Sequence, residues 1–489
     1  MVGATHSPTA LPLTDFSLST YVHSHRVAPG MIALYTPFGH EVTFVPDQIW
    51  DCLKQNFLTE VPDQILNDLI SRQFVVPPDF DRNALYNYVI PPMRGFINLW
   101  LIVVQTCNMG CSYCVVEADD QTKKLPVLPM LSQVEKGRMT PQIAEAAIQL
   151  YAKNLEKTRP PHARVTIYGG EPLLNKEVLF SAIPQIRAIS YTGQKFPIEI
   201  LCFTNGLTYD ESVTALFTKY QVTVGLSLDG KKEHHDAARK KLDGSGTFER
   251  VVESYNLYKK AGLNIGVSCT VGKHNVDDLP EIARYFIEDL KVPSVQFQTP
   301  IQVPDAKNEY YVEMKDAAAS ALAAFKRFRA AGIDEGLAMR RISRFIEGKF
   351  HHRDCLAVGG ELAVSPDGTT GPCHNATIGG SQYFKGNVLD SKCDPEKQPN
   401  FTEWHARMPL NMPDCHGCSF IGLCGGGCPY NALLTKGSIW EKDPLQCGYM
   451  EEFVDWLLED IWERYSNPTA FTHSSQATNR ERNSMALGH

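Results

Sequence analysis

The stretch FINLWLIVVQTCNMGCSYC, residues 96–114, decides the fold because it joins an apolar run to a loop that carries three cysteines. The run from Phe96 to Val104 is almost entirely apolar, which is typical of a strand buried on both faces of a parallel sheet. In such sheets, reactive side chains gather on the loops that follow the carboxyl ends of the strands. The stretch therefore predicts a parallel sheet with a functional site just beyond its first strand.

The spacing of Cys107, Cys111 and Cys114, with three and then two residues between them, indicates a metal centre. Three thiolates can hold three irons of a [4Fe–4S] cluster and leave the fourth iron open to a ligand that is not protein. Zinc is the alternative, but structural zinc sites take four ligands, and no fourth cysteine or histidine follows locally.

The composition excludes several classes of protein. A chain of 489 residues is too long for one compact core and predicts about two to four domains. Its 47 Lys and Arg against 55 Asp and Glu argue against a nucleic-acid binder. The sequence has no long apolar run and no secretory signal, so we expect a cytoplasmic protein without a membrane span. In such a chain, fourteen cysteines favour metal or cluster binding over disulfides.

Strand-like and helical runs alternate six times between residue 96 and about residue 302. This alternation predicts an α/β fold whose parallel sheet forms a partial (β/α)6 barrel. Two helices have clear start signals: Thr140 as cap before Pro141, and Thr247 as cap of a helix that ends near Gly262. The strands are expected at residues 96–104, 163–168, 198–203, 222–228, 264–271 and 294–301.

The remaining segments surround this barrel. Two strands, two short helices and a returning strand predict a small winged-helix-like α+β domain before it. The segment after it is rich in Gly, Pro, Asp and Cys, which indicates a Cys-rich domain that relies on metal for its stability and is closed by a helix. That helix has Met450, Phe453, Trp456, Leu457 and Ile461 on one face. The expected boundaries are a flexible N-terminus at 1–20, the winged-helix-like domain at 21–92, the barrel at 93–307, a helical bridge at 308–350, the Cys-rich domain at 351–465 and a disordered tail at 466–489.

Further motifs stand at the carboxyl ends of the next three strands. They are Gly-Gly-Glu-Pro at 169–172, Thr-Asn-Gly at 204–206 and Ser-Leu-Asp-Gly at 227–230, the last followed by Arg239. With CxxxCxxC and the aromatic Tyr113 before its third cysteine, this set resembles the signature of radical S-adenosylmethionine (SAM) enzymes.

The resemblance implies roles for the motif residues around SAM. Gly169 and Gly170 let backbone approach the ligand's amine, and Glu171 accepts a hydrogen bond or holds the loop. Arg239 pairs with the ligand's carboxylate. Contacts with the ribose are expected from Ser227 and Asn205, and Tyr113 is expected to pack near the adenine.

A second group of cysteines resembles the seven-cysteine pattern of the SPASM domain. The resemblance implies one auxiliary cluster on Cys355, Cys373 and Cys428, and another on Cys415, Cys418, Cys424 and Cys447, hence three [4Fe–4S] clusters in all. Two clusters with four cysteines each would need an eighth cysteine. Either one iron is open to substrate, or Cys393 or a group other than cysteine completes the site. A zinc ribbon over residues 415–428 is the alternative.

The combined resemblance implies a maturase of ribosomally made peptides. A 5′-deoxyadenosyl radical would abstract hydrogen from the precursor and install a carbon–carbon, ether or thioether cross-link. The precursor's leader would bind the N-terminal domain, and a reductant such as flavodoxin or ferredoxin would supply electrons. His374 is the candidate base. The alternatives are an anaerobic sulfatase-maturing enzyme, in which an Asp typically stands at the position of His374, and a non-catalytic iron–sulfur electron-transfer protein.

Overall fold

The structure is a computed structural model that describes residues 12–38, 41–88, 92–114, 137–298, 310, 312, 314–377 and 382–468. The expectations of a flexible N-terminus and a disordered tail fall mostly on residues outside these ranges. No helix within the described ranges is long and apolar enough to cross a bilayer.

The centre of the fold is a nine-stranded sheet in which six neighbouring strands run parallel and in chain order, which confirms the predicted α/β fold with a partial (β/α)6 barrel. The central strands read as continuous apolar runs because both of their faces are covered. The strands are β6 (Asn98–Val104), β7 (Arg164–Gly169), β8 (Glu199–Thr204), β9 (Thr223–Ser227), β10 (Ile265–Thr270) and β11 (Ser294–Gln298).

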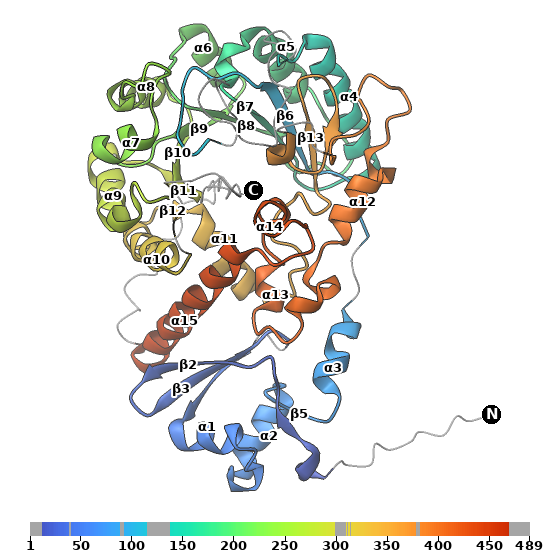
Figure 1. Ribbon diagram of the computed structural model, residues 1–489, viewed down its shortest axis with the longest axis vertical. Coiled ribbons are helices and arrows are strands. Elements are labelled where there is room, and N and C mark those ends of the chain that lie inside the picture. The colour runs from blue at the N-terminus through green and yellow to red at the C-terminus, as the bar shows by residue number, and fades with distance from the viewer. Residues whose placement is uncertain are drawn as a thin grey trace, which may run out of the picture.

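Helices follow the strands and cover the outside of the sheet (Figure 1). Their bounds are α4 (Pro141–Thr158), α5 (Lys176–Arg187), α6 (Glu211–Lys219), α7 (Lys232–Ala238), α8 (Phe248–Lys260) and α9 (Leu279–Tyr285).

Both predicted cap residues, Thr140 and Thr247, stand at the N-caps of their helices, but only Thr140 caps its helix with its side chain. The hydroxyl of Thr140 accepts a hydrogen bond from the Ile143 amide at 3.3 Å, as expected of a capping side chain. The Thr247 hydroxyl instead donates to the carbonyl of Arg239 at 2.8 Å. The start of α8 is held by the carboxylate of Asp236, which accepts from the amides of Thr247 and Phe248. A carboxylate from α7 thus takes the place of the predicted local cap.

The Cys-rich segment is joined to the barrel sheet, which the sequence does not indicate. Strand β13 (Glu361–Val364) pairs in parallel with β6, and β14 (Thr370–Gly371) pairs antiparallel with β13. The segment lies over the open side of the barrel (Figure 1). The remaining elements are α10 (Met314–Ala330), β12 (Asp334–Glu335), α11 (Gly336–Glu347), α12 (Pro399–Ala406), α13 (Ile421–Cys424), α14 (Pro429–Lys436) and α15 (Pro444–Ser466).

The N-terminal unit is a three-stranded antiparallel sheet with short helices on one face, as predicted for a small α+β unit. Its other face packs on α15, where Ala33 and Tyr35 share a buried cluster with Met450, Val454 and Leu458. The elements are β1 (Ser17–Leu18), β2 (His23–Ala28), β3 (Met31–Thr36), β4 (Glu41–Pro46), α1 (Asp47–Lys54), α2 (Asp63–Ser71), β5 (Val75–Val76) and α3 (Phe80–Ala84). The closing helix therefore connects this unit to the Cys-rich segment.

Candidate active site

The three-cysteine loop after β6 opens onto a cavity of about 360 Å³. Two backbone hydrogen bonds tie the loop to the end of α7: the Gly110 amide donates to the Lys240 carbonyl at 2.9 Å, and the Ser112 amide donates to the Ala238 carbonyl at 3.0 Å. All fourteen cysteines of the chain are free of disulfides. The cavity is lined by Cys107, Cys111 and Cys114 together with Tyr113, Gly169, Gly170, Asn205, Ser227 and Arg239.

Gly169 and Gly170 are required by the close approach of two strand ends. A Cβ atom would lie 2.2 Å from the Val104 carbonyl oxygen at Gly169, and 2.3 Å from the Thr106 carbonyl oxygen at Gly170. No side chain fits at such distances, so these glycines let the end of β7 lie against the start of the cysteine loop.

Glu171 is fully buried and lies behind the cavity wall rather than in it. Its carboxylate accepts hydrogen bonds from the Asn205 amide at 2.7 Å, the Leu173 amide at 3.0 Å and the Thr204 hydroxyl at 2.9 Å. Burial raises the pKa of Glu171 to about 7, although these hydrogen bonds act to lower it. Glu171 thus holds the end of β8, where the Asn205 side chain donates to the Cys107 sulfur at 3.4 Å.

Tyr113 and Arg239 are joined by Asp229, which is fully buried. Its carboxylate accepts from the Tyr113 hydroxyl and forms an ion pair with the Arg239 Nε at 2.9 Å, while the guanidinium lies 5.3 Å from the Tyr113 ring centroid. Burial acts to raise the pKa of Asp229, but Arg239 and His274 hold it well below its usual range. Arg239 therefore lines the cavity while its guanidinium is held by the ion pair with Asp229. The sequence interpretation named the Ser-Leu-Asp-Gly motif but did not single out Asp229 as a site residue.

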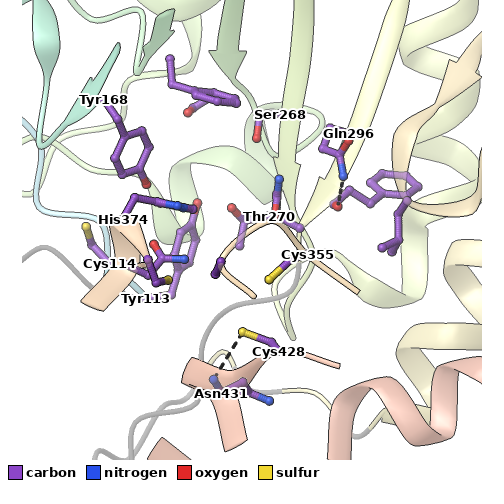
Figure 2. A pocket seen from close by; sticks show the side chains of 18 of the residues that line it. Tyr113, Cys114, Tyr168, Ser268, Thr270, Gln296, Cys355, His374, Cys428 and Asn431 are labelled. Atoms are coloured by element: carbon purple, nitrogen blue, oxygen red, sulfur yellow. Dashed lines mark hydrogen bonds between the residues drawn. The ribbon is translucent and has the colours of Figure 1, made fainter. Parts of the chain in front are cut away.

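The same cavity is also lined by three cysteines of the Cys-rich segment, Cys355, Cys373 and Cys428. Figure 2 shows Tyr113, Cys114 and His374 on one side, with Cys355 and Cys428 across from them. These three thiols are electrostatic neighbours: besides burial, Cys355 raises the pKa of both Cys373 and Cys428. The structure therefore brings together the three cysteines that the sequence assigns to one auxiliary cluster.

The other four predicted ligands, Cys415, Cys418, Cys424 and Cys447, do not line this cavity. They form a second group: burial and then Cys418 and Cys447 raise the pKa of Cys415 to about 11, and Cys447, after burial and Asp354, also raises the pKa of Cys424. Cys393 belongs to neither group: its sulfur lies 3.7 Å from the Gln398 side-chain nitrogen and is outside the cavity wall.

His374 is fixed from two sides. Its Nδ1 lies 3.0 Å from a carboxylate oxygen of Glu361, and its ring stacks on the indole of Trp100 with centroids 3.5 Å apart. Glu361 and Trp100 also line the cavity, and the sequence interpretation missed both. The run GGELAV at 359–364 is typical of a short apolar strand, and nothing in its sequence indicates that Glu361 belongs to a site.

The donor set fits iron–sulfur clusters better than single zinc ions. Sulfurs around one zinc lie about 3.8 Å apart, given a Zn–S distance of about 2.3 Å and tetrahedral geometry. Among the described residues, the sole trio of donors within 4.8 Å of one another is Glu361, Cys373 and His374. The thiols of the three cysteine groups are thus spread more widely than around one ion, which suits a cluster that places each thiolate on a different iron.

Residues 101–286, which include the cysteine loop and β6 to α9, match the family model of the Radical SAM superfamily. The chain carries a radical SAM domain, and this family uses SAM together with a [4Fe–4S] cluster.

Two relatives are similar to this chain over most of its length. The radical SAM cyclopropyl synthase TigE of Paramaledivibacter caminithermalis is 22% identical over 381 residues, 73% of this chain and 73% of that protein. A cysteine-type anaerobic sulfatase-maturating enzyme of Clostridium perfringens is 24% identical over 336 residues, 66% of this chain and 85% of that protein.

Two solved structures share the fold. Native anSMEcpe with bound AdoMet matches with a TM-score of 0.63 at 19% identity, over 76% of this chain and 99% of that one. Streptococcus suis SuiB bound to precursor peptide SuiA matches with a TM-score of 0.52 at 13% identity, over 88% and 99%.

Proposed function

We propose that this chain is a radical SAM maturase that modifies a ribosomally made precursor peptide and installs a cross-link between its side chains or to its backbone. The observation that carries this proposal is that one cavity is lined both by Cys107, Cys111 and Cys114 and by Cys355, Cys373 and Cys428. A substrate carbon in this cavity lies between the site that starts the reaction and a group that can accept an electron.

SAM bound at a reduced [4Fe–4S] cluster supplies a 5′-deoxyadenosyl radical, which removes hydrogen from an unactivated carbon. Cys107, Cys111 and Cys114 would hold that cluster. The backbone at Gly169 and Gly170, the side chains of Asn205 and Ser227, and the Arg239–Asp229 pair would position SAM, with Glu171 holding Asn205 from behind.

The second group of cysteines would hold a further auxiliary cluster next to a buried basic set. Arg340, Arg341 and Arg344 of α11 surround the carboxylate of Asp354 at 3.8, 4.0 and 3.0 Å. Arg344 also donates to the Cys424 carbonyl at 3.3 Å, so this basic set lies beside the second group, where it would help to balance the negative charge of a thiolate-ligated cluster. A flavodoxin or ferredoxin is the proposed electron donor.

His374 is the proposed base that takes a proton from the substrate once its hydrogen has been removed. Its ring lines the cavity, and its contacts with Glu361 and Trp100 restrict how it can turn. A base held in one orientation by a carboxylate is a common arrangement in proton transfer.

A peptide substrate is supported by the relatives and by the N-terminal unit. One relative is named as a cyclopropyl synthase and one similar fold was solved with its precursor peptide. Here β2 and β4 are the edge strands of the N-terminal sheet. An edge strand can bind an extended peptide by adding a strand, so this unit is the proposed site for the leader.

The experiment is to co-express this chain with a short peptide encoded beside its gene and to measure the peptide's mass. A cross-link predicts a loss of about 2 Da, as bond counting for cofactor-driven chemistry gives. The matched control is the Cys111→Ala chain, which should leave the peptide unchanged. An unmodified peptide with an active, fully loaded chain would contradict the proposed substrate class.

Sulfatase maturation is the second candidate, favoured by the relative that is 24% identical and by the TM-score of 0.63. Its product, formylglycine, carries an aldehyde that reacts with a hydrazide probe, whereas a cross-linked peptide does not. The resemblance to sulfatase-maturing enzymes implies an Asp at position 374. This chain has His374 there, which disfavours sulfatase maturation. Incubation with a peptide holding a sulfatase's target Cys or Ser, followed by hydrazide labelling, separates the two. A non-catalytic electron-transfer protein would form neither product.

A further inference from the structure

We propose that the carboxylate of Glu361 is the fourth protein ligand of the auxiliary cluster on Cys355, Cys373 and Cys428. The inference rests on the proposed function, because it assumes that these thiols hold a cluster. A [4Fe–4S] cluster with three cysteine ligands leaves one iron without a thiolate. The geometry of the cavity indicates which side chain reaches it.

No further thiol is available at this wall of the cavity. Cys393 lies outside it, against Gln398. Cys202 and Cys269 are buried within β8 and β10, and Cys52 lies on α1 of the N-terminal unit. The fourth ligand is therefore a group other than cysteine.

Glu361 stands at the right place for that ligand. It is the first residue of β13, is 4% exposed and lines the cavity. One of its oxygens lies within 4.8 Å of the Cys373 sulfur. Its charge also contributes to the raised pKa of both thiols, after burial for Cys373 and after burial and Asp354 for Cys355, so the carboxylate lies near both of them.

The hydrogen bonds of Glu361 leave one oxygen for a metal. Oε1 accepts from the His374 backbone amide at 2.9 Å and lies 3.0 Å from His374 Nδ1, whereas no hydrogen bond to Oε2 is found within the described chain. No Lys or Arg of the described ranges forms an ion pair with it. A buried carboxylate without a cation is costly, and a ligating carboxylate is typically held by hydrogen bonds of this kind.

An oxygen ligand would give this cluster an exchangeable iron. Carboxylate oxygen binds iron of such clusters less well than the softer thiolate does. Because Glu361 lines the cavity, the iron that it holds would face the substrate site.

The test uses the full chain with Cys107, Cys111 and Cys114 changed to Ala, loaded anaerobically with ⁵⁷Fe and sulfide so that only auxiliary clusters remain. Mössbauer spectra of this background chain, which keeps Glu361, are compared with those of the same chain carrying Glu361→Gln or Glu361→Cys. Glu335→Gln is the control, because Glu335 is also a buried carboxylate but does not line the cavity. We expect about one iron in eight to differ from the thiolate-ligated ones, and Glu361→Cys to make all irons alike.

A second readout is brief exposure to air followed by EPR spectroscopy. We expect a [3Fe–4S] signal several-fold larger in Glu361→Gln than in the background chain, and suppression of that signal in Glu361→Cys. If Glu361→Gln and Glu361→Cys leave the spectra unchanged, the inference about Glu361 is overturned but the proposed function is not. The same holds if these variants lose a single bound metal ion while the clusters stay intact. A background chain that holds no cluster iron overturns the proposed function and this inference with it.

Discussion

The imidazole of His374 lies parallel to the indole of Trp100, with ring centroids 3.5 Å apart and an angle of 4° between the planes. Trp100 belongs to β6, and His374 follows Cys373 in the Cys-rich segment. This stack is therefore a direct contact between the barrel strand that leads to the first cysteine loop and the segment that carries the auxiliary cysteines. The stack therefore places the candidate base His374 at the junction of the barrel and the Cys-rich segment.

Replacing His374 by Ala should separate SAM cleavage from peptide modification. Loss of a general base costs about 10²–10⁴-fold in rate, so modified peptide should fall by that factor while 5′-deoxyadenosine still forms. The ratio of the two products, measured by mass spectrometry, checks this. His162→Ala is the control, since His162 is exposed and lies away from the cavity. An unchanged ratio in His374→Ala would show that another group takes the proton.

Replacing Gly170 by Ala should displace the first cysteine loop. The added Cβ would lie 2.3 Å from the Thr106 carbonyl oxygen, and overpacking of this kind costs about 1–3 kcal/mol. We expect the chain to lose about four irons, those of one cluster. Gly137→Ala is the control, because Gly137 also lies against the start of the cysteine loop, at Gln105, but its Cβ would meet its nearest atom at 3.5 Å. Iron analysis of both variants decides the point, and equal iron contents would count against the proposed packing.

The free energy of unfolding should depend on pH through Glu171. Its pKa of about 7 in the folded chain exceeds the ordinary value of 4.5. The folded chain therefore binds more protons than the unfolded chain between these values, and stability falls as pH rises through that window. Relative to Glu171→Gln, the natural chain should lose about 2 kcal/mol between about pH 5.5 and pH 8. Anaerobic urea unfolding of both chains measures this, and a difference independent of pH would show that the carboxyl is not protonated at low pH.

Single cysteine variants should distinguish ligands from spectators. Cys373→Ala should disturb the auxiliary cluster at the cavity, because its thiol lies with Cys355 and Cys428. Cys393→Ala should leave the iron and sulfide contents at about twelve irons per chain, the value for three clusters. Loss of about four irons on changing Cys393 would instead make it a ligand and would remove the need for Glu361.

Much of this fold can be predicted from the sequence because parallel strands buried on both faces read as apolar runs. The run at 96–104 gives β6, and the motif residues after each strand lie at one cavity because parallel strands end at the same edge. The cap at Thr140 is likewise local, since the side chain and the amide that it binds are three residues apart.

Features that depend on distant pairing could not be predicted. The capping of α8 by Asp236 and the pairing of β13 with β6 join segments whose separate sequences contain no sign of the partner. Asp229 and Glu361 belong to the same category, because a single acid becomes a site residue only through the groups that the fold brings to it. The cysteines are the exception, since their spacing alone indicates cluster binding.

We expect this chain to use SAM to start radical chemistry at the first cysteine loop. To test this, the chain is loaded to about twelve irons and incubated with SAM and dithionite, and 5′-deoxyadenosine is quantified by liquid chromatography and mass spectrometry. We expect 5′-deoxyadenosine from the natural chain and none from the chain with Cys107, Cys111 and Cys114 changed to Ala. Absence of 5′-deoxyadenosine from the fully loaded natural chain, or equal amounts from both chains, would contradict it.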